Sequence, residues 1–222
     1  MQVLPRQFTA HQQGQILDWE AAKRWRVLPA GTIFPAVVRY PPPSVLGGGS
    51  LIADRAGIAK QASCRSATDA VVAAVLARDG CQAVLRATYV DRTDSYVVTV
   101  GVAAFPGMTQ AAAAEQALGS PTVTRAKGPD GSAVGVLTVK VTGTPAAWFD
   151  NDLRQVSARQ VASAYVIFYT IGYADTRPIV PVESNPYAYA EMTSLGAGVA
   201  DAVQNVLAVP LPQPHCPGTA GC

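Results

Sequence analysis

Residues 83–102, AVLRATYVDRTDSYVVTVGV, decide the fold of this chain. Two runs rich in valine, threonine and tyrosine flank the polar segment Thr93-Asp94-Ser95. β-Branched and aromatic residues favour strands, whereas Asp and Ser favour turns. The stretch therefore predicts an antiparallel hairpin with strands at 83–91 and 96–102.

Helices are expected on both sides of this hairpin. Residues 66–69 resemble the N-terminus of a helix that continues to Arg78 and that Gly80 ends. The other predicted helices lie at 9–28, 109–118, 152–163 and 187–207. The other predicted strands lie at 33–40, 134–141 and 165–173, and the last should be central because it is the most apolar. Because β-α-β regularity is missing, we predict the α+β class, with a mixed, mainly antiparallel sheet, packed helices and stabilising disulfides.

The chain of 222 residues is predicted to form one domain, because no linker of distinct composition divides it. Residues 31–208 should form a single α+β domain, preceded by a juxtamembrane-like extension at 1–30. Residues 209–222 should form a disulfide-bonded tail rich in proline and glycine. With 49% hydrophobic residues, a chain of this length can bury a substantial core.

Charge and hydropathy exclude several classes of partner and segment. Only 14% of residues are charged, the net charge is +2, and Lys and Arg are scattered along the chain. A nucleic-acid-binding protein concentrates them in a patch, so no nucleic acid is expected as a partner. No run of about 18 apolar residues is present, and residues 1–15 lack the apolar centre of a signal peptide. If the protein is exported, its targeting element is expected upstream of Met1.

Four cysteines predict disulfides and therefore an oxidising compartment. Cys64 and Cys81 flank the predicted helix at 66–78, and Cys216 and Cys222 lie in the terminal tail. An even number of cysteines, two of them in a Pro/Gly-rich tail, favours disulfides over free thiols.

Three pairings of the four cysteines are possible. The ends of one continuous helix over 66–78 would lie about 20 Å apart. A disulfide needs its two Cα atoms within about 7 Å, whereas an extended tail from Cys216 to Cys222 spans about 20 Å. We therefore expect the tail to lie beside the helix and to be joined to it at both ends. Local pairing, Cys64 with Cys81 and Cys216 with Cys222, is the alternative.

The residues of several catalytic devices are missing from the sequence. The two histidines, His11 and His215, lie in the terminal segments, outside the predicted core. No G-x-S-x-G motif is present, and the cysteines lack the paired spacing of structural zinc sites. Asp150 and Asp152 are expected to cap the helix that begins there. We therefore predict a protein that is not an enzyme and that holds no cofactor or metal.

Tryptophans and basic residues alternate near the N-terminus and form a candidate interface. They are Trp19, Arg24, Trp25 and Arg26. Indoles and cations are typical of the membrane–water interface, where both lie at the level of the lipid headgroups. A surface helix docked on the domain explains the same pattern without a membrane.

Arg86 is the second candidate site residue, because it interrupts an apolar strand. A buried arginine needs a partner, and Asp175 or Asp69 could supply the carboxylate. An ion pair or an edge position is the structural explanation for Arg86 and Asp175, and a ligand site is the functional one.

Several blocks of the sequence are similar to those of a known group of proteins. The blocks are Trp25-Arg26, Pro29–Pro35, Gly80–Asp91, Thr99–Val102, Gly172–Asp175 and Cys216–Cys222. The chain resembles uncharacterised actinobacterial membrane-anchored proteins with an outward-facing domain, from about residue 16 to its end. The resemblance implies a transmembrane helix upstream of this sequence. It implies no activity and no functional residues.

Three functions are therefore considered. The first is a non-enzymatic extracytoplasmic domain of a cell-envelope protein that senses, scaffolds or binds a partner, either an envelope protein or the membrane surface. The second is a carrier of a small molecule or lipid, with a pocket between the sheet and the C-terminal helix. The third is an enzyme that uses carboxylates such as Asp69, Asp91 or Asp175.

Overall fold

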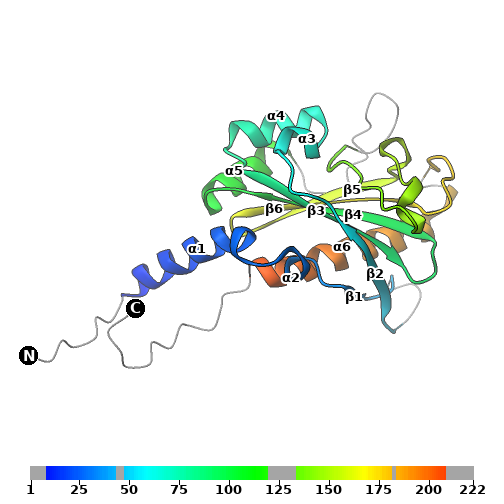
Figure 1. The fold of residues 1–222 in the computed structure, drawn as a ribbon, viewed down its shortest axis with the longest axis horizontal. Helices are drawn as coiled ribbons and strands as arrows, with labels where there is room; N and C mark the ends of the chain where they lie inside the picture. Colours follow the sequence, from blue (N-terminus) through cyan, green and yellow to red (C-terminus); the bar gives the residue numbers. More distant parts are fainter. Residues whose placement is uncertain (1–8, 44–47, 120–133, 182–183, 209–222) are drawn as a thin grey trace, which may run out of the picture.

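The computed structural model describes residues 9–43, 48–119, 134–181 and 184–208. Its centre is a six-stranded antiparallel sheet in the order β1-β2-β3-β4-β6-β5, with helices on both faces (Figure 1). The strands are β1 Val37–Tyr40, β2 Leu51–Ile58, β3 Ala83–Asp91, β4 Tyr96–Ala104, β5 Val156–Ala162 and β6 Tyr165–Tyr173. The predicted α+β class with a mainly antiparallel sheet is confirmed.

The central hairpin of β3 and β4 forms where the sequence predicts it. Its pairing runs from Ala83↔Ala104 to Val90↔Val97. The buried carboxylate of Asp91 closes the turn by accepting hydrogen bonds from the backbone N–H groups of Ser95 (2.9 Å) and Tyr96 (2.6 Å). An Asp that binds the backbone of its own turn holds that turn in one conformation.

Two layers of helices cover the sheet (Figure 1). The layer on one face contains α2 Ala30–Ile33 and the long α6 Pro186–Leu207. The layer on the other face contains α3 Cys64–Ala67, α4 Ala70–Arg78 and α5 Met108–Ala117. Because residues alternate between the two faces of a strand, β3, β4 and β6 supply apolar side chains to a separate core on each side.

Two glycines allow α6 to lie close to the sheet. A methyl group added at Gly196 would overlap the ring of Tyr169, and one added at Gly198 would overlap Tyr40. Met192, Leu195 and other apolar residues of α6 are fully buried against the same face. The helix is therefore in direct contact with the strands along this stretch.

The first helix, α1 Ala10–Val27, is capped by Thr9 and docks on the domain through its last turns. Arg24 Nη1 donates a hydrogen bond to the carbonyl of Leu207 (3.0 Å) at the end of α6, where a cation also complements the helix dipole. The Tyr165 hydroxyl donates to the carbonyl of Ala21 and accepts from the N–H of Trp25. The rest of α1 extends beyond the sheet as an arm (Figure 1).

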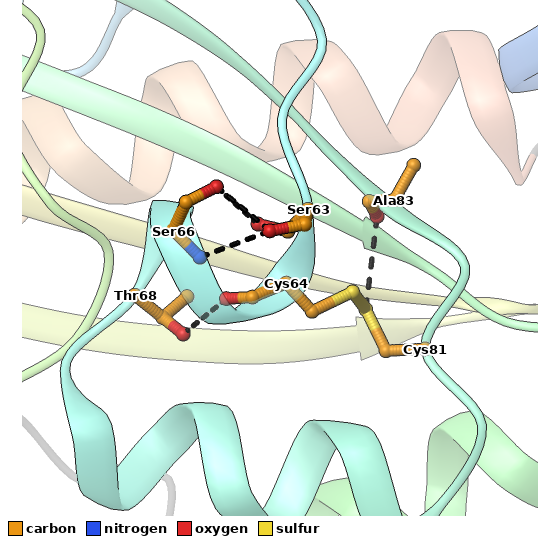
Figure 2. The surroundings of a disulfide bond; sticks show 6 residues. All are labelled: Ser63, Cys64, Ser66, Thr68, Cys81 and Ala83. Carbon is orange, nitrogen blue, oxygen red and sulfur yellow. Dashed lines mark hydrogen bonds between the residues drawn. A yellow bond between two sulfur atoms is a disulfide. The ribbon is translucent and has the colours of Figure 1, made fainter.

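The helix predicted over 66–78 is two helices, and this changes the disulfide pairing. Thr68 has extended backbone angles (φ −136°, ψ 161°), so α3 ends there and the chain turns before α4. The turn brings Cys64 and Cys81 to a Cα–Cα distance of 6.3 Å, where they form a disulfide (Figure 2). The predicted bridge from this helix to the tail is therefore wrong, and local pairing is correct for Cys64 and Cys81. Cys216 and Cys222 lie outside the described residues.

Other predicted elements also differ from the structure. Residues 33–40 divide into the end of α2 and the strand β1, and residues 152–163 form the end of a 3-10 helix, Asn151–Leu153, followed by β5. The sequence of β5 favours a helix locally, but pairing with the buried strand β6 overrides that preference. Residues 134–141 form no strand of the sheet, and the strand β2 was not predicted.

We expect Gly196→Ala to lower the free energy of unfolding by about 1–3 kcal/mol, because the added methyl group overlaps a buried tyrosine ring. Gly14→Ala in α1 is the matched control, since nothing lies within 4 Å of a methyl group there. Replacing a helical glycine by alanine at an open position is neutral or stabilising, by up to about 1 kcal/mol. Urea denaturation followed by circular dichroism measures both values. Equal destabilisation by the two substitutions would contradict the close packing of α6.

Candidate functional site

A polar hollow of about 200 Å³ lies where the β3–β4 turn, the end of β6 and the start of α6 meet. Its lining combines hydroxyl, carboxylate, amide and guanidinium groups with two aromatic rings. The lining residues are Asp94, Ser95, Tyr96, Tyr173, Asp175, Arg177 and Asn185.

Two tyrosines hold the wall of the polar hollow in place. Tyr96 of β4 and Tyr173 of β6 are register partners, and their ring centroids lie 5.7 Å apart. The Tyr96 hydroxyl donates a hydrogen bond of 2.7 Å to Glu191 Oε2 on α6. Burial, and then the hydrogen bond to the Glu191 carboxylate, raise the pKa of Tyr96. Tyr96 is therefore a neutral donor over the physiological pH range.

An ion pair at the surface completes the polar hollow. Arg177 Nε donates to both carboxylate oxygens of Asp175 at 2.9 Å, and its guanidinium lies 4.4 Å from the centroid of the Tyr173 ring. The hydrogen bonds from Arg177 lower the pKa of Asp175. Both side chains are about half exposed, and such pairs contribute at most about 1 kcal/mol to stability. Because the pair adds little to stability, a partner that binds Arg177 or Asp175 changes the stability of the fold very little.

Arg86 and Asp175, the predicted ion pair, are not brought together. Arg86 Nη1 donates to the carbonyl of Leu137 (3.1 Å), and burial lowers the pKa of this guanidinium. The other predicted partner, Asp69, instead binds Arg154 through Nη1–Oδ2 (2.6 Å) and Nη2–Oδ1 (2.9 Å). The importance of Arg154 was missed because residues 152–163 were predicted as one helix.

Residues 134–141, which we call the strap, cross the face of the sheet that α3 to α5 cover. The N–H of Val139 donates to Thr99 Oγ1 (3.2 Å), and Thr88 Oγ1 donates to the carbonyl of Val139 (2.8 Å). Near the start of the strap, the N–H of Gly135 donates to Asp69 Oδ2 (2.6 Å). Buried hydroxyls of the sheet and the Asp69–Arg154 pair therefore hold the strap.

The four residues of the predicted N-terminal interface divide into two pairs. Arg24 and Trp25 are 7% and 8% exposed, and both belong to the contact between α1 and the domain. Trp19 is 60% exposed, and Arg26 is also exposed. The outer surface of α1 therefore retains one tryptophan and one arginine of the predicted set.

The residues proposed for a carrier pocket and for a pair of catalytic carboxylates make other contacts in the structure. Gly196 and Gly198 bring α6 into contact with the strands where the sequence suggested a pocket. Asp69 binds Arg154, Asp91 accepts hydrogen bonds from the hairpin turn, and Asp175 binds Arg177. Asp150 and Asp152 were predicted to cap a helix over 152–163. Asp150 instead caps the 3-10 helix Asn151–Leu153 by accepting from the N–H of Asn151, and Asp152 lies in the first turn of that 3-10 helix.

We expect Arg154→Met to lower the free energy of unfolding by about 3 kcal/mol, because it leaves Asp69 without its cation in a largely buried site. The matched control is Arg92→Met, which breaks the exposed pair with Asp54 and should cost less than about 1 kcal/mol. Thermal and urea unfolding measure both changes. Similar losses in the two variants would show that the Asp69–Arg154 pair does not hold the strap.

Comparison with known proteins adds no relative to this description. No protein-family model, curated protein or solved structure matches the chain. Among the described residues, no helix has both the length and the apolar character needed to cross a membrane. Within the same ranges, no group of three or more His, Cys, Asp or Glu side chains is placed to bind a metal ion.

Proposed function

We propose that this chain is the outward-facing domain of a cell-envelope protein and that it binds a partner rather than catalysing a reaction. The proposed compartment rests on the Cys64–Cys81 disulfide, which is consistent with an oxidising environment. The resemblance to actinobacterial membrane-anchored proteins supports the same location and an anchor upstream of residue 1.

The polar hollow supports binding of a protein partner. Both faces of the sheet are occupied by packed cores, so recognition falls to the exposed surface. Tyrosine and arginine are enriched at the centres of protein interfaces, and the polar hollow is lined by the half-exposed Arg177 together with Tyr96 and the buried Tyr173. Tyr187, at the start of α6 and close in sequence to the lining residue Asn185, adds a ring that is 64% exposed.

Size and charge favour a basic protein segment over a small molecule. The hollow of about 200 Å³ is smaller than the roughly 300–1,000 Å³ that encloses most small ligands. Asp94 and Asp175 line it, Glu191 accepts a hydrogen bond from the lining residue Tyr96, and Arg177 is the one cation among the described residues of its lining. This excess of carboxylates complements a partner segment that carries Lys or Arg.

The compartment is tested by labelling thiols in protein isolated from its native host. Under denaturing conditions without reductant, an alkylating reagent should leave Cys64 and Cys81 unmodified, because a disulfide sulfur is not a nucleophile. After reduction both should be alkylated, which mass spectrometry of the peptides measures. Alkylation of both before reduction would remove the basis of the envelope assignment.

Partner binding is tested by placing a photoreactive residue at Tyr187 in the full-length protein inside intact cells. The matched control position is Val71 on α4, which is 72% exposed and lies in the other helix layer. We expect Tyr187 to cross-link to one envelope protein and Val71 not to. Asp175→Lys should abolish this product by reversing the charge at the polar hollow. The same products from both positions, or a product that survives Asp175→Lys, would exclude the polar hollow as the binding surface.

A further inference from the structure

The outer side of α1 presents a tryptophan and two cations along one line. Consecutive residues of a helix differ by about 100° around its axis. On that geometry, Ile16, Trp19, Lys23, Arg26 and Val27 fall within an arc of about 100°, and we call this set the outer stripe. It lies opposite the face that docks on the domain. Trp19 is 60% exposed and Val27 is 75% exposed.

The outer stripe carries two cations and is bordered by one acidic residue. Lys23 and Arg26 are the charged residues of the outer stripe, and by the same geometry Glu20 lies about 20° beyond Val27, whereas Asp18 falls about 80° beyond Arg26. Lys23 Nζ lies 3.3 Å from the centroid of the Trp19 ring, so an aromatic surface and a positive charge are adjacent. Arg26 is exposed and its Nη2 donates to Gln82 Oε1 at 2.9 Å, which leaves the other N–H groups of the guanidinium for an anion.

The shape of this surface favours a flat and extended occupant. Beside Trp19 lies an open hollow lined by Gln12, Gln15 and Ile16, and the described residues of its lining all come from α1. A depression with walls from one helix gives little enclosure to a protruding side chain of a partner. α1 extends beyond the sheet as an arm (Figure 1), and Trp19 and Val27 of its outer stripe are exposed.

We propose that the outer stripe of α1 rests on an anionic membrane surface. Trp19 lies at the level of the lipid headgroups, and Lys23 and Arg26 lie against lipid phosphates. This inference rests on the proposed envelope location and adds the surface that contacts the bilayer. Each basic side chain near an anionic bilayer raises partitioning about fivefold, so the contact orients a domain that is tethered by other means rather than anchoring it.

The test uses the full chain and two kinds of vesicle, one of pure phosphatidylcholine and one with about a third phosphatidylglycerol. Co-sedimentation measures the partition coefficient. We expect binding to the anionic vesicles only, and a loss of about 25-fold in the variant Lys23→Gln/Arg26→Gln. The charge-matched control is Lys60→Gln/Arg65→Gln, at exposed positions before and within α3, which should retain binding. An equal loss of vesicle binding in both double variants would show that binding depends on net charge alone, and this result would overturn the proposal.

Tryptophan substitutions provide a second, independent measurement. Trp19→Ala should reduce partitioning about tenfold, whereas Trp148→Ala, at a residue that is 72% exposed on a 3-10 helix, should not. The fluorescence of Trp148→Ala should shift to shorter wavelength on anionic vesicles as Trp19 leaves water. A Trp19-dependent dimer without lipid, measured by analytical ultracentrifugation, would assign the outer stripe to a second copy and overturn the proposal. If vesicles fail to bind while the thiol assay shows the disulfide, the membrane contact is wrong and the envelope location stands.

Discussion

The buried ion pair between Asp69 and Arg154 joins three segments that regular secondary structure does not connect. Asp69 precedes α4, Arg154 precedes β5, and both bind the strap, since Asp69 accepts from the N–H of Gly135 and Arg154 donates to the carbonyl of Val136. A bidentate pair between arginine and carboxylate fixes both distance and orientation. The end of the α3–α4 turn, the path of the strap and the start of β5 therefore depend on one contact.

The same contact has a consequence for the disulfide. Because α4 begins after Asp69, α3 is free to turn back over the sheet, and Cys64 reaches Cys81 at the other end of α4. The loop that the disulfide closes is short, with a sequence separation of 17. Closing a loop of this size removes about 3 kcal/mol of unfolded-state entropy in the simplest model. The disulfide thus joins the two ends of the α3–α4 unit, and the Asp69–Arg154 pair restrains the turn between the two helices.

The local sequence pattern predicts an element correctly where burial and intrinsic propensity favour the same secondary structure. It fails where the two favour different structures. The β3–β4 hairpin and α6 follow from valine-rich alternation and from helical spacing. The strand β5 contains Ala158, Arg159 and Gln160, which favour a helix, and it is a strand because its backbone pairs with β6. The break at Thr68 lies in a sequence with an acceptable helical pattern, and the contacts that stabilise it come from residues far along the chain. The sequence indicated Asp175 as a candidate but did not indicate the polar hollow around it. The residues that line the hollow come from three separate parts of the sequence, which only the fold brings together.

The docking of α1 connects the two proposed surfaces. Arg24 binds the carbonyl ends of α6, and Tyr165 of β6 binds the backbone of α1, so the direction of the arm is set by the core and not by a linker. The polar hollow lies at the N-terminal end of α6 and α1 lies at its C-terminal end. A helix of 22 residues is about 33 Å long at 1.5 Å per residue. If α1 lies on the bilayer, α6 is a rigid link of about that length between the membrane contact and the polar hollow, so a partner binds at the hollow without displacing α1 from the lipid.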